Sequence, residues 1–204
     1  MKTLIVYKSN TGFTKEYVDM IKKRIVDATV VEIKKLNSKL IKQHDIIFYG
    51  GPLRNNVILG LNKFLKYNDK FGDKDIFIFA TGIQPIDNEK KELVIDTNHL
   101  DLYHVRLYLL PGGLDISKMS KFQQKMIKFG LKMAEKSGKM PGGIDSSMIE
   151  SRLNTPLNLV SPLSIERMME VYTLVNLKRM KNKTKWCTRI IFYKVLNNLF
   201  YLDL

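Results

Sequence analysis

The sequence predicts an α/β protein built on a doubly wound, five-stranded parallel sheet. Short, continuous runs of apolar and β-branched residues alternate with segments of helical periodicity, and glycine or proline follows several of the runs. Continuous apolar runs are typical of strands that are covered on both faces. Because strands that alternate with helices are joined by right-handed crossovers, we expect the strands to lie parallel.

Five runs carry the strand prediction. They are residues 3–7, 30–33, 45–49, 76–80 and 105–110. The second is short and reads as an edge strand. The third is expected to end at Gly50–Pro52, the fourth at Thr81–Gly82 and the fifth at Pro111–Gly113, because glycine and proline interrupt regular structure.

Helices are expected between and after these strands. The first is predicted from apolar residues at three- and four-residue steps between Tyr17 and Ile25. Two more are expected near residues 59–67 and 89–98. A closing helix is expected over residues 163–175, introduced by Ser161 and Pro162 as cap and first-turn proline.

Length and composition set the domain organisation. A chain of 204 residues supports one substantial core, so we expect one domain over residues 1–176 and an extension over residues 177–204. The single cysteine, Cys187, cannot form an internal disulfide. The first strand leaves no room for a signal peptide before it, and no uninterrupted apolar run is long enough to span a membrane. These features predict a cytoplasmic protein. The net charge of +14 attracts phosphates, nucleic acid, acidic proteins or anionic lipid without choosing among them.

A hydroxyl-rich loop follows the first predicted strand. It consists of Ser9, Asn10, Thr11, Gly12, Phe13 and Thr14. Backbone N–H groups at the start of the next helix, together with these hydroxyls, form an anion site. The loop has neither the Gly-Lys-Ser/Thr of a triphosphate loop nor the three spaced glycines of a dinucleotide fingerprint. It therefore favours a terminal monophosphate, with an ordinary Ser/Thr helix cap as the alternative.

This loop resembles that of the flavodoxin family, which reads Ser/Thr-x-Thr-Gly-x-Thr and is matched here by Ser9, Thr11, Gly12 and Thr14. The resemblance covers roughly residues 1–176 and implies a strand order 2-1-3-4-5 with FMN as cofactor. It also implies two further loops that sandwich the flavin ring. They would be Gly50–Asn56, which includes Pro52, Leu53, Arg54 and Asn55, and Thr81–Gln84, which includes Gly82 and Ile83. Neither loop contains the tryptophan or tyrosine with which ordinary flavodoxins stack on the flavin.

Within this superfamily the sequence is more similar to the flavodoxin-like, quinone-dependent protoporphyrinogen dehydrogenases of bacteria. The resemblance is carried by Met1–Ile5, Gly50–Arg54 and the long segment Leu114–Gly143, which would be a helical insertion around the fifth strand. It implies an oxidoreductase of heme biosynthesis that passes electrons from protoporphyrinogen through FMN to a quinone. An FMN electron carrier without a small-molecule substrate of its own is the alternative.

The insertion is predicted to contain an amphipathic helix over residues 117–139. One face is a lysine stripe that consists of Lys118, Lys121, Lys125, Lys128, Lys132 and Lys136. The adjacent arc consists of Met119, Phe122, Met126, Ile127, Phe129, Met133 and Ala134. The apolar arc is expected to pack on the sheet; the alternative is that the helix lines a substrate site or rests on anionic membrane, on its inner face.

The C-terminal extension is basic near residues 178–185 and then mixes aromatic and aliphatic residues. It suits either a membrane interface or a docked helix. Other chemistries have little support, because the three histidines lack partners at zinc spacing and Cys187 lacks a triad pattern. Nucleic-acid binding satisfies the charge but has no recognition motif. Arg54 is the candidate for an anionic substrate group or the flavin's pyrimidine edge, with a surface arginine as the alternative.

Overall fold

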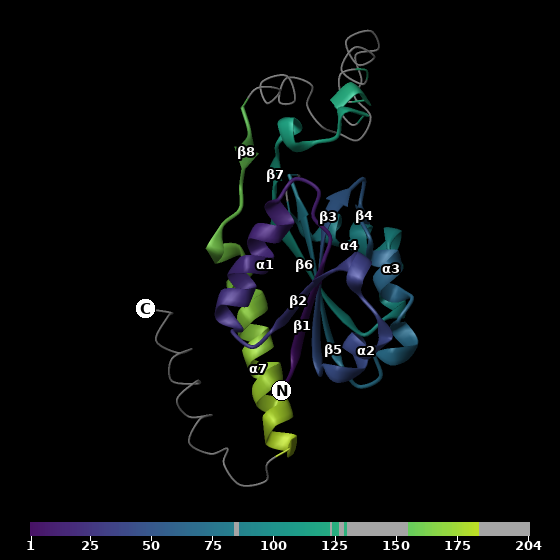
Figure 1. Ribbon diagram of the computed structural model, residues 1–204, viewed down its shortest axis with the longest axis vertical. Coiled ribbons are helices and arrows are strands. Elements are labelled where there is room, and N and C mark those ends of the chain that lie inside the picture. Colours follow the sequence, from purple (N-terminus) through teal and green to yellow (C-terminus); the bar gives the residue numbers. More distant parts are fainter. Residues whose placement is uncertain (84–85, 123, 127–128, 130–154, 184–204) are drawn as a thin grey trace.

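The computed structural model describes residues 1–83, 86–122, 124–126, 129 and 155–183. Its core is a parallel sheet in the order β2-β1-β3-β5-β6 (Figure 1). These strands are β1 (Thr3–Tyr7), β2 (Thr29–Glu32), β3 (Ile46–Arg54), β5 (Asp75–Gly82) and β6 (Val105–Pro111). The predicted doubly wound α/β fold is confirmed, since the five strands expected from the sequence have the order 2-1-3-4-5 when numbered among themselves.

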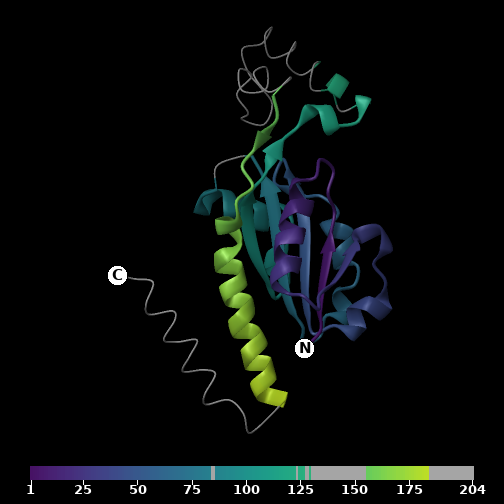
Figure 2. The ribbon, with the colours of Figure 1, turned by 60° about the vertical axis from the view of Figure 1, so that its left-hand side comes forward.

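Helices cover both faces of the sheet (Figures 1 and 2). On one face, α1 (Phe13–Arg24) and α7 (Glu166–Lys183) pack against a core that contains Phe48, Phe77 and Phe79. On the other face lie α2 (Ser38–Gln43), α3 (Leu61–Leu65) and α4 (Asn88–Thr97). The central strands are buried on both sides, which explains why their sequences are continuously apolar rather than alternating.

Strand β3 and helix α2 differ from the prediction. Strand β3 does not end at Gly50 but pairs with β5 as far as Pro52 and continues to Arg54. A Cβ on Gly50 would lie 2.2 Å from the ring of Phe79, so this glycine makes room for a neighbouring side chain inside the sheet. Helix α2 was not predicted; its first turn is capped by Asn37, whose side chain accepts a hydrogen bond from the backbone of Leu40 at 3.0 Å.

The closing helix is longer than predicted. A 3-10 turn at Pro162–Ile165 leads into α7, which continues to Lys183 and so passes residue 176, where the expected domain boundary lies. The bidentate hydrogen bonds from Arg24 to Glu166 join the end of α1 to the start of α7. The rest of the predicted C-terminal extension lies outside the described residues.

Beyond β6, the chain leaves the sheet at its carboxyl edge. Strand β7 (Gly113–Leu114) pairs antiparallel with β8 (Leu157–Asn158), which brings the chain back toward α7. A 3-10 turn at Ile116–Lys118 follows β7 and is capped by Asp115. Hydrogen bonds from Ser117 and the Lys118 ammonium hold the pKa of Asp115 below its ordinary value. Most of the insertion predicted over residues 114–143 lies outside the described residues.

Candidate functional site

The hydroxyl-rich loop lies at the carboxyl edge of the sheet, between β1 and α1. The backbone N–H of Lys8 donates to the carbonyl of Gly50 at 2.8 Å, which fixes the start of the loop against β3. Gly12 has φ +102°, a conformation that L side chains rarely adopt, and a Cβ there would meet nothing within 4 Å. The loop therefore turns sharply at Gly12 and leaves open space beside it.

The first turn of α1 has no side-chain cap within the described residues. Gly12 occupies the cap position and has no side chain to offer, and the Ser9 hydroxyl accepts from the Gly12 N–H at 3.2 Å rather than from the helix. The positive end of a twelve-residue helix thus lies next to the hydroxyls of Ser9 and Thr11. Phe13 contributes only its backbone here, because its ring is buried against Gly113 of β7.

Thr14 connects two of the three predicted ligand loops. Its hydroxyl forms a buried 2.8 Å hydrogen bond with the hydroxyl of Thr81, at the end of β5. Tyr17, one turn later on α1, donates to the carbonyl of Pro111 at 2.8 Å and accepts from the backbone of Ser161 at 3.2 Å. Tyr17 was not among the predicted site residues, because nothing in its local sequence shows that its hydroxyl bridges these two distant segments.

The second predicted loop is a strand and a tight hairpin. Pro52, Leu53 and Arg54 lie on β3, and Asn55 and Asn56 form the turn into β4 (Val57–Ile58) with φ values of +48° and +65°. Asparagine tolerates this left-handed conformation better than most residues.

The side chain and backbone of Asn56 both serve to hold this hairpin. Its Oδ1 accepts from the Lys90 ammonium at 2.5 Å, and its carbonyl accepts from Asn98 at 2.6 Å. Asn98 also accepts from the Ile58 backbone at 2.9 Å. Sequence reasoning missed these anchors, because Asn98 sits at a helix end where an asparagine is unremarkable.

Arg54 is exposed, and no described residue forms an ion pair or hydrogen bond with its guanidinium. Leu53 beside it approaches Gly82, where a Cβ would lie 3.5 Å from the Leu53 Cβ. The Gly82 carbonyl in turn accepts from Gly112 at 2.6 Å. Ile83 is partly buried beyond Gly82, and Gln84 lies outside the described residues. The structure thus brings the three predicted loops together at one edge, with Arg54 available to an anion.

Two hollows lie near this edge. One, of about 680 Å³, is lined by Ser9 and Asn10 but by none of the other predicted ligand residues. The other, of about 890 Å³, follows the outer strand β6 between α4 and α7.

Metal and membrane features are limited in the described part of the chain. There, no three His, Cys, Asp or Glu side chains gather in a way that could hold a metal ion. His44 is buried, and its ring contacts the Leu40 carbonyl at 2.6 Å and the Thr29 hydroxyl at 3.0 Å, so its role is structural. Every described helix is too short or too polar to cross a bilayer.

The described apolar side chains of the predicted amphipathic helix from Phe122 on do not pack on the sheet, contrary to expectation. Phe122, Met126 and Phe129 lie on helical backbone and are 73%, 51% and 60% exposed. Lys121 and Lys125 are also exposed, whereas Lys118 pairs with Asp115 at 3.1 Å. Figure 1 shows this segment standing clear of the sheet above its carboxyl edge. The remaining members of the predicted lysine stripe, from Lys128 on, lie outside the described residues.

The sheet order, with helices on both faces, defines a doubly wound α/β protein whose hydroxyl-rich loop lies at the switch point of the sheet. A sequence model of the flavodoxin domain matches residues 4–140, more than half of the chain, so this protein belongs to the flavodoxin domain family. No curated protein sequence matches the chain.

Several solved structures are similar in fold. A flavodoxin, WrbA-like protein from Agrobacterium tumefaciens is 17% identical, with a TM-score of 0.42, over 59% of this chain and 86% of its own. The two-electron reduced flavodoxin of Megasphaera elsdenii is 18% identical, with a TM-score of 0.40, over 59% of this chain and 89% of the flavodoxin. The Trp repressor binding protein of Bacillus subtilis is 13% identical, with a TM-score of 0.41, over 55% and 84%.

Proposed function

We propose that this protein binds FMN at the carboxyl edge of its sheet and uses it for electron or hydride transfer. The observation that carries the proposal is the start of α1, where Gly12 has φ +102° and no described side chain caps the first turn of the helix. Uncapped N–H groups and the positive helix end favour a phosphate dianion. A carboxylate cap would compete for the same position, and the loop contains none.

The residues present fit this cofactor. Ser9 and Thr11 supply hydroxyls, the start of α1 supplies backbone N–H groups, and the space beside Gly12 is open. Pro52–Arg54 and Thr81–Gly82 lie on the adjacent strands and would offer backbone groups to the polar edge of the ring. FMN, when bound, supplies the redox centre. The chain's part is to orient that centre, and Arg54 would hold an anionic group near it.

The finer proposal is a dehydrogenase that oxidises protoporphyrinogen and passes the electrons to a quinone. Three features support it: the sequence resemblance, the net charge of +14, and the absence of tryptophan and tyrosine from Gly50–Asn56 and Thr81–Gln84. A largely apolar donor that carries carboxylates would be attracted by the positive charge. The family match itself favours a second candidate, an FMN electron carrier with no small-molecule substrate.

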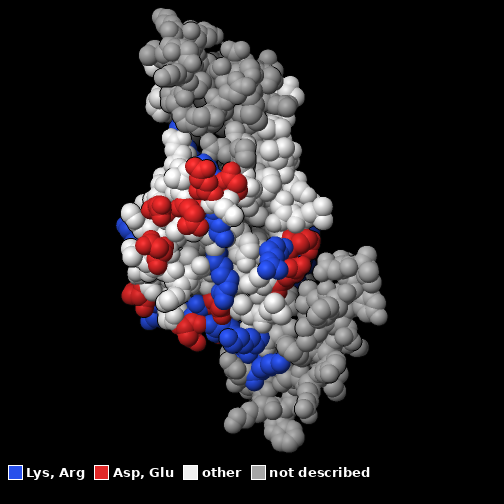
Figure 3. Space-filling model, turned by 180° about the vertical axis from the view of Figure 1, so that it is seen from behind, with Lys and Arg blue, Asp and Glu red and all other residues white. Residues whose placement is uncertain are grey.

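We further propose that the enzyme meets its quinone at an anionic membrane surface inside the cell. The exposed rings of Phe122 and Phe129, next to Lys121 and Lys125, provide apolar side chains that can insert and cations that attract headgroups. By contrast, the face in Figure 3 is not uniformly basic: acidic side chains gather in its upper part and basic ones run down its middle. Such interspersed charge does not favour a continuous nucleic-acid surface.

Cofactor binding is tested directly on the pure protein. We expect a flavin absorbance band after purification, or quenching of FMN fluorescence on titration into the apoprotein. A colourless protein that does not bind FMN in large excess would overturn the proposal. Riboflavin, which lacks the phosphate, is the matched control and should bind much more weakly, because the proposed site recognises the phosphate.

Turnover separates enzyme from carrier. Anaerobic bleaching of the bound flavin by protoporphyrinogen, followed by reoxidation with a soluble quinone, would support the dehydrogenase. Reduction only by a partner reductase would support the carrier. Arg54→Ala should lower turnover at limiting substrate, whereas Arg167→Ala, which removes an exposed arginine at the start of α7, should not.

Membrane binding is tested by sedimentation with vesicles. Vesicles rich in phosphatidylglycerol should carry the protein down and phosphatidylcholine vesicles should not. The variant Phe122→Ser with Phe129→Ser should lose this binding, while Leu163→Ser, which removes another exposed apolar side chain, should retain it. Equal binding by both variants would contradict the proposed docking residues.

A further inference from the structure

A hollow of about 680 Å³ lies beside the hydroxyl-rich loop, on the face of the sheet that carries α3 and α4. Its walls come from the ends of β1 and β2, from β4 and α3, and from the residues that follow α4. The volume is in the range of small-molecule sites, roughly 300–1,000 Å³. Crevices outside the carboxyl ends of parallel strands are where doubly wound sheets bind ligands.

The lining carries an excess of positive charge. Lys8, Lys34 and Lys63 all line the hollow, and Glu32 is the carboxylate among its lining residues. Glu32 pairs with Lys34 at 2.7 Å. Within the described part of the chain, Lys8 and Lys63 form no ion pair, so two cations are left for an anion that enters the hollow.

The side chain of Lys8 lies close to Gly60. Gly60 has φ +86°, and a Cβ there would lie 3.0 Å from the Cδ of Lys8 and 2.6 Å from the hydroxyl of Tyr49. The Tyr49 hydroxyl itself donates to the Leu59 carbonyl at 2.8 Å. The aliphatic stem of Lys8, which lines the hollow, therefore lies close to Gly60, where an added side chain would collide with it.

The rest of the lining suits an apolar body. Ile33, Leu61 and Leu65 contribute aliphatic surface, and the exposed amides of Asn10 and Asn62 can donate and accept hydrogen bonds. A site with aliphatic walls, a few amides and two uncompensated ammonium groups matches a ring-sized molecule that carries an acidic group.

We propose that this hollow is a second ligand site, for an organic anion with a ring-sized apolar body and a phosphate or carboxylate group. The site shares Ser9 and Asn10 with the proposed FMN loop but is lined by none of Thr11–Thr14 and by none of Pro52–Asn56. Most residues of the two sites therefore differ, so both sites can be occupied at once, and the proposal does not require that FMN binds.

Calorimetric titration tests the proposal on the full chain, both as purified and with excess FMN. The probes are adenosine 5'-monophosphate for an organic phosphate, 2-naphthoate for an organic carboxylate, and adenosine for an uncharged ring. At least one anion should bind in both states of the protein, and the stronger of the two identifies the preferred acidic group. Absence of binding by both anions at millimolar concentration, equal binding of adenosine, or loss of binding on FMN saturation would each overturn the proposal.

Two lysines of one short segment provide a matched pair of variants. Lys63 lines the hollow, whereas Lys66, three residues later and also exposed, does not. Lys63→Gln should weaken binding of the anion about five-fold, as expected for the loss of about one charge contact. Lys66→Gln should change the affinity less than two-fold. Lys8→Gln should act like Lys63→Gln. Equal effects of the variants at 63 and 66 would show that the anion senses only the overall charge, which would also overturn the proposal.

Discussion

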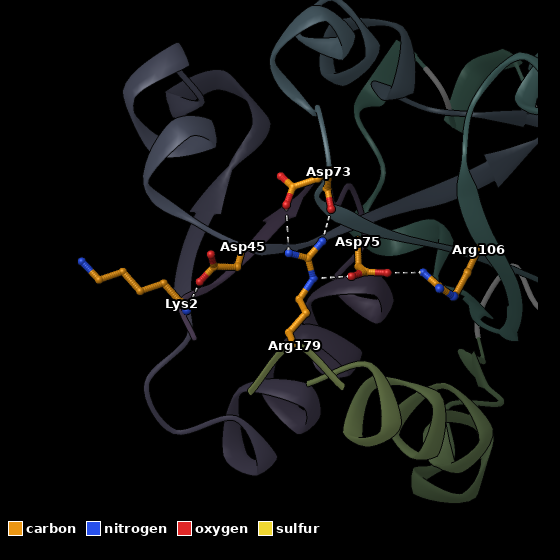
Figure 4. Close-up of polar contacts among 6 residues, drawn as sticks. All are labelled: Lys2, Asp45, Asp73, Asp75, Arg106 and Arg179. Carbon is orange, nitrogen blue, oxygen red and sulfur yellow. Dashed lines mark hydrogen bonds and ion pairs between the residues drawn. The ribbon is translucent and has the colours of Figure 1, made fainter. Parts of the chain in front are cut away.

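The two edges of the central sheet are held by different chemistry. At the amino edge, Arg179 of α7 donates to Asp75 at 2.5 Å and also binds Asp73, while Arg106 of β6 donates to the other oxygen of Asp75 at 2.9 Å (Figure 4). Nearby, the Lys2 backbone N–H donates to Asp45 at 2.9 Å. At the carboxyl edge, the contacts between loops use hydroxyls, backbone groups and glycines, as in the Thr14–Thr81 pair.

This difference shows how the fold separates stability from binding. Paired charges at the amino edge satisfy one another. Burial alone would lower the pKa of Arg179, but the hydrogen bond with Asp75 and the negative charges of Asp75, Asp73 and Asp45 have the larger effect. The pKa of Arg179 is therefore raised. At the carboxyl edge, no described side chain caps the start of α1 or pairs with Lys8, Lys63 or Arg54, which leaves positive potential for ligands. Variants at the two edges should therefore affect different measurements.

The largest effect is expected from Gly50→Ala, inside β3. The added Cβ would lie 2.2 Å from the Phe79 ring, between strands that cannot separate without loss of their pairing. We expect about 3 kcal/mol or more of lost stability in urea unfolding, and loss of FMN binding with it. Gly72→Ala is the control, because a Cβ there meets nothing within 4 Å and only the φ of +52° opposes it. Equal losses in both variants would contradict the packing role of Gly50.

Arg179→Met should show most clearly that the amino edge affects stability without affecting FMN binding. Asp75, whose side chain is 19% exposed, would lose one of its two cations, and we expect roughly 2 kcal/mol of lost stability. The FMN dissociation constant should remain within two-fold, since the site lies at the opposite edge. Arg167→Met, which removes an arginine that is 82% exposed, should cost less than about 0.5 kcal/mol. A change in FMN affinity without a change in stability would disprove the separation.

Gly12→Ala should act at the carboxyl edge. No atom obstructs the added Cβ, so the cost comes from the backbone conformation at φ +102°, about 1–2 kcal/mol. Relief of this strain would turn the start of α1, and FMN should bind at least ten-fold more weakly, with riboflavin affected less. Fluorescence titration measures both. Unchanged FMN affinity would show that the start of α1 does not hold the phosphate.

Thr81→Val should cost about 1 kcal/mol, because it leaves the buried Thr14 hydroxyl without its partner. The double variant with Thr14→Val removes both hydroxyls and should be less destabilised than the sum of the single variants. Calorimetric melting of the four proteins measures the coupling. Strict additivity would mean that the 2.8 Å contact contributes nothing to stability.

The sequence predicted the parts of the fold that local pattern determines. The run Thr3–Tyr7 is buried on both faces because it is continuously apolar, and the loop from Ser9 lies where a strand meets a helix. Gly50 was misread as a break, because sequence alone does not show that the Phe79 ring occupies the space of a side chain. Packing between strands supplied that information.

Contacts between distant residues could not be predicted. Arg179 lies 104 residues from Asp75, and Asn98 lies 42 residues from Asn56, so no local motif links either pair. The polar sequence near Lys178 also concealed the length of α7, whose last described turns are joined to β5 by the hydrogen bond from Arg179 to Asp75. Sequence located the candidate site but not the contacts that shape it.

The smallest effect is expected from the exposed pair that joins α1 and α7. The hydrogen bonds from Arg24 hold the pKa of Glu166 below its ordinary value. The positive charge of Arg24 acts in the same direction, and burial acts against it. A carboxyl whose pKa is lowered by folding stabilises the folded protein at pH values above its ordinary pKa, 4.5. This stabilisation is lost as the pH falls through the folded-state pKa. Because both side chains are more than one third exposed, solvent screening reduces the contribution to about 0.3 kcal/mol.

Urea unfolding of the wild type and Glu166→Gln measures this contribution. The variant should be slightly less stable at pH 7 and should approach the wild type as the pH falls through the folded-state pKa of Glu166, below which this carboxyl is protonated in both the folded and the unfolded state. Added salt should reduce the difference at pH 7, since the pair is exposed. A stability difference that is independent of both pH and salt would assign the effect to helix packing. The charged pairs of this protein would then contribute to stability at the amino edge and not where α1 meets α7.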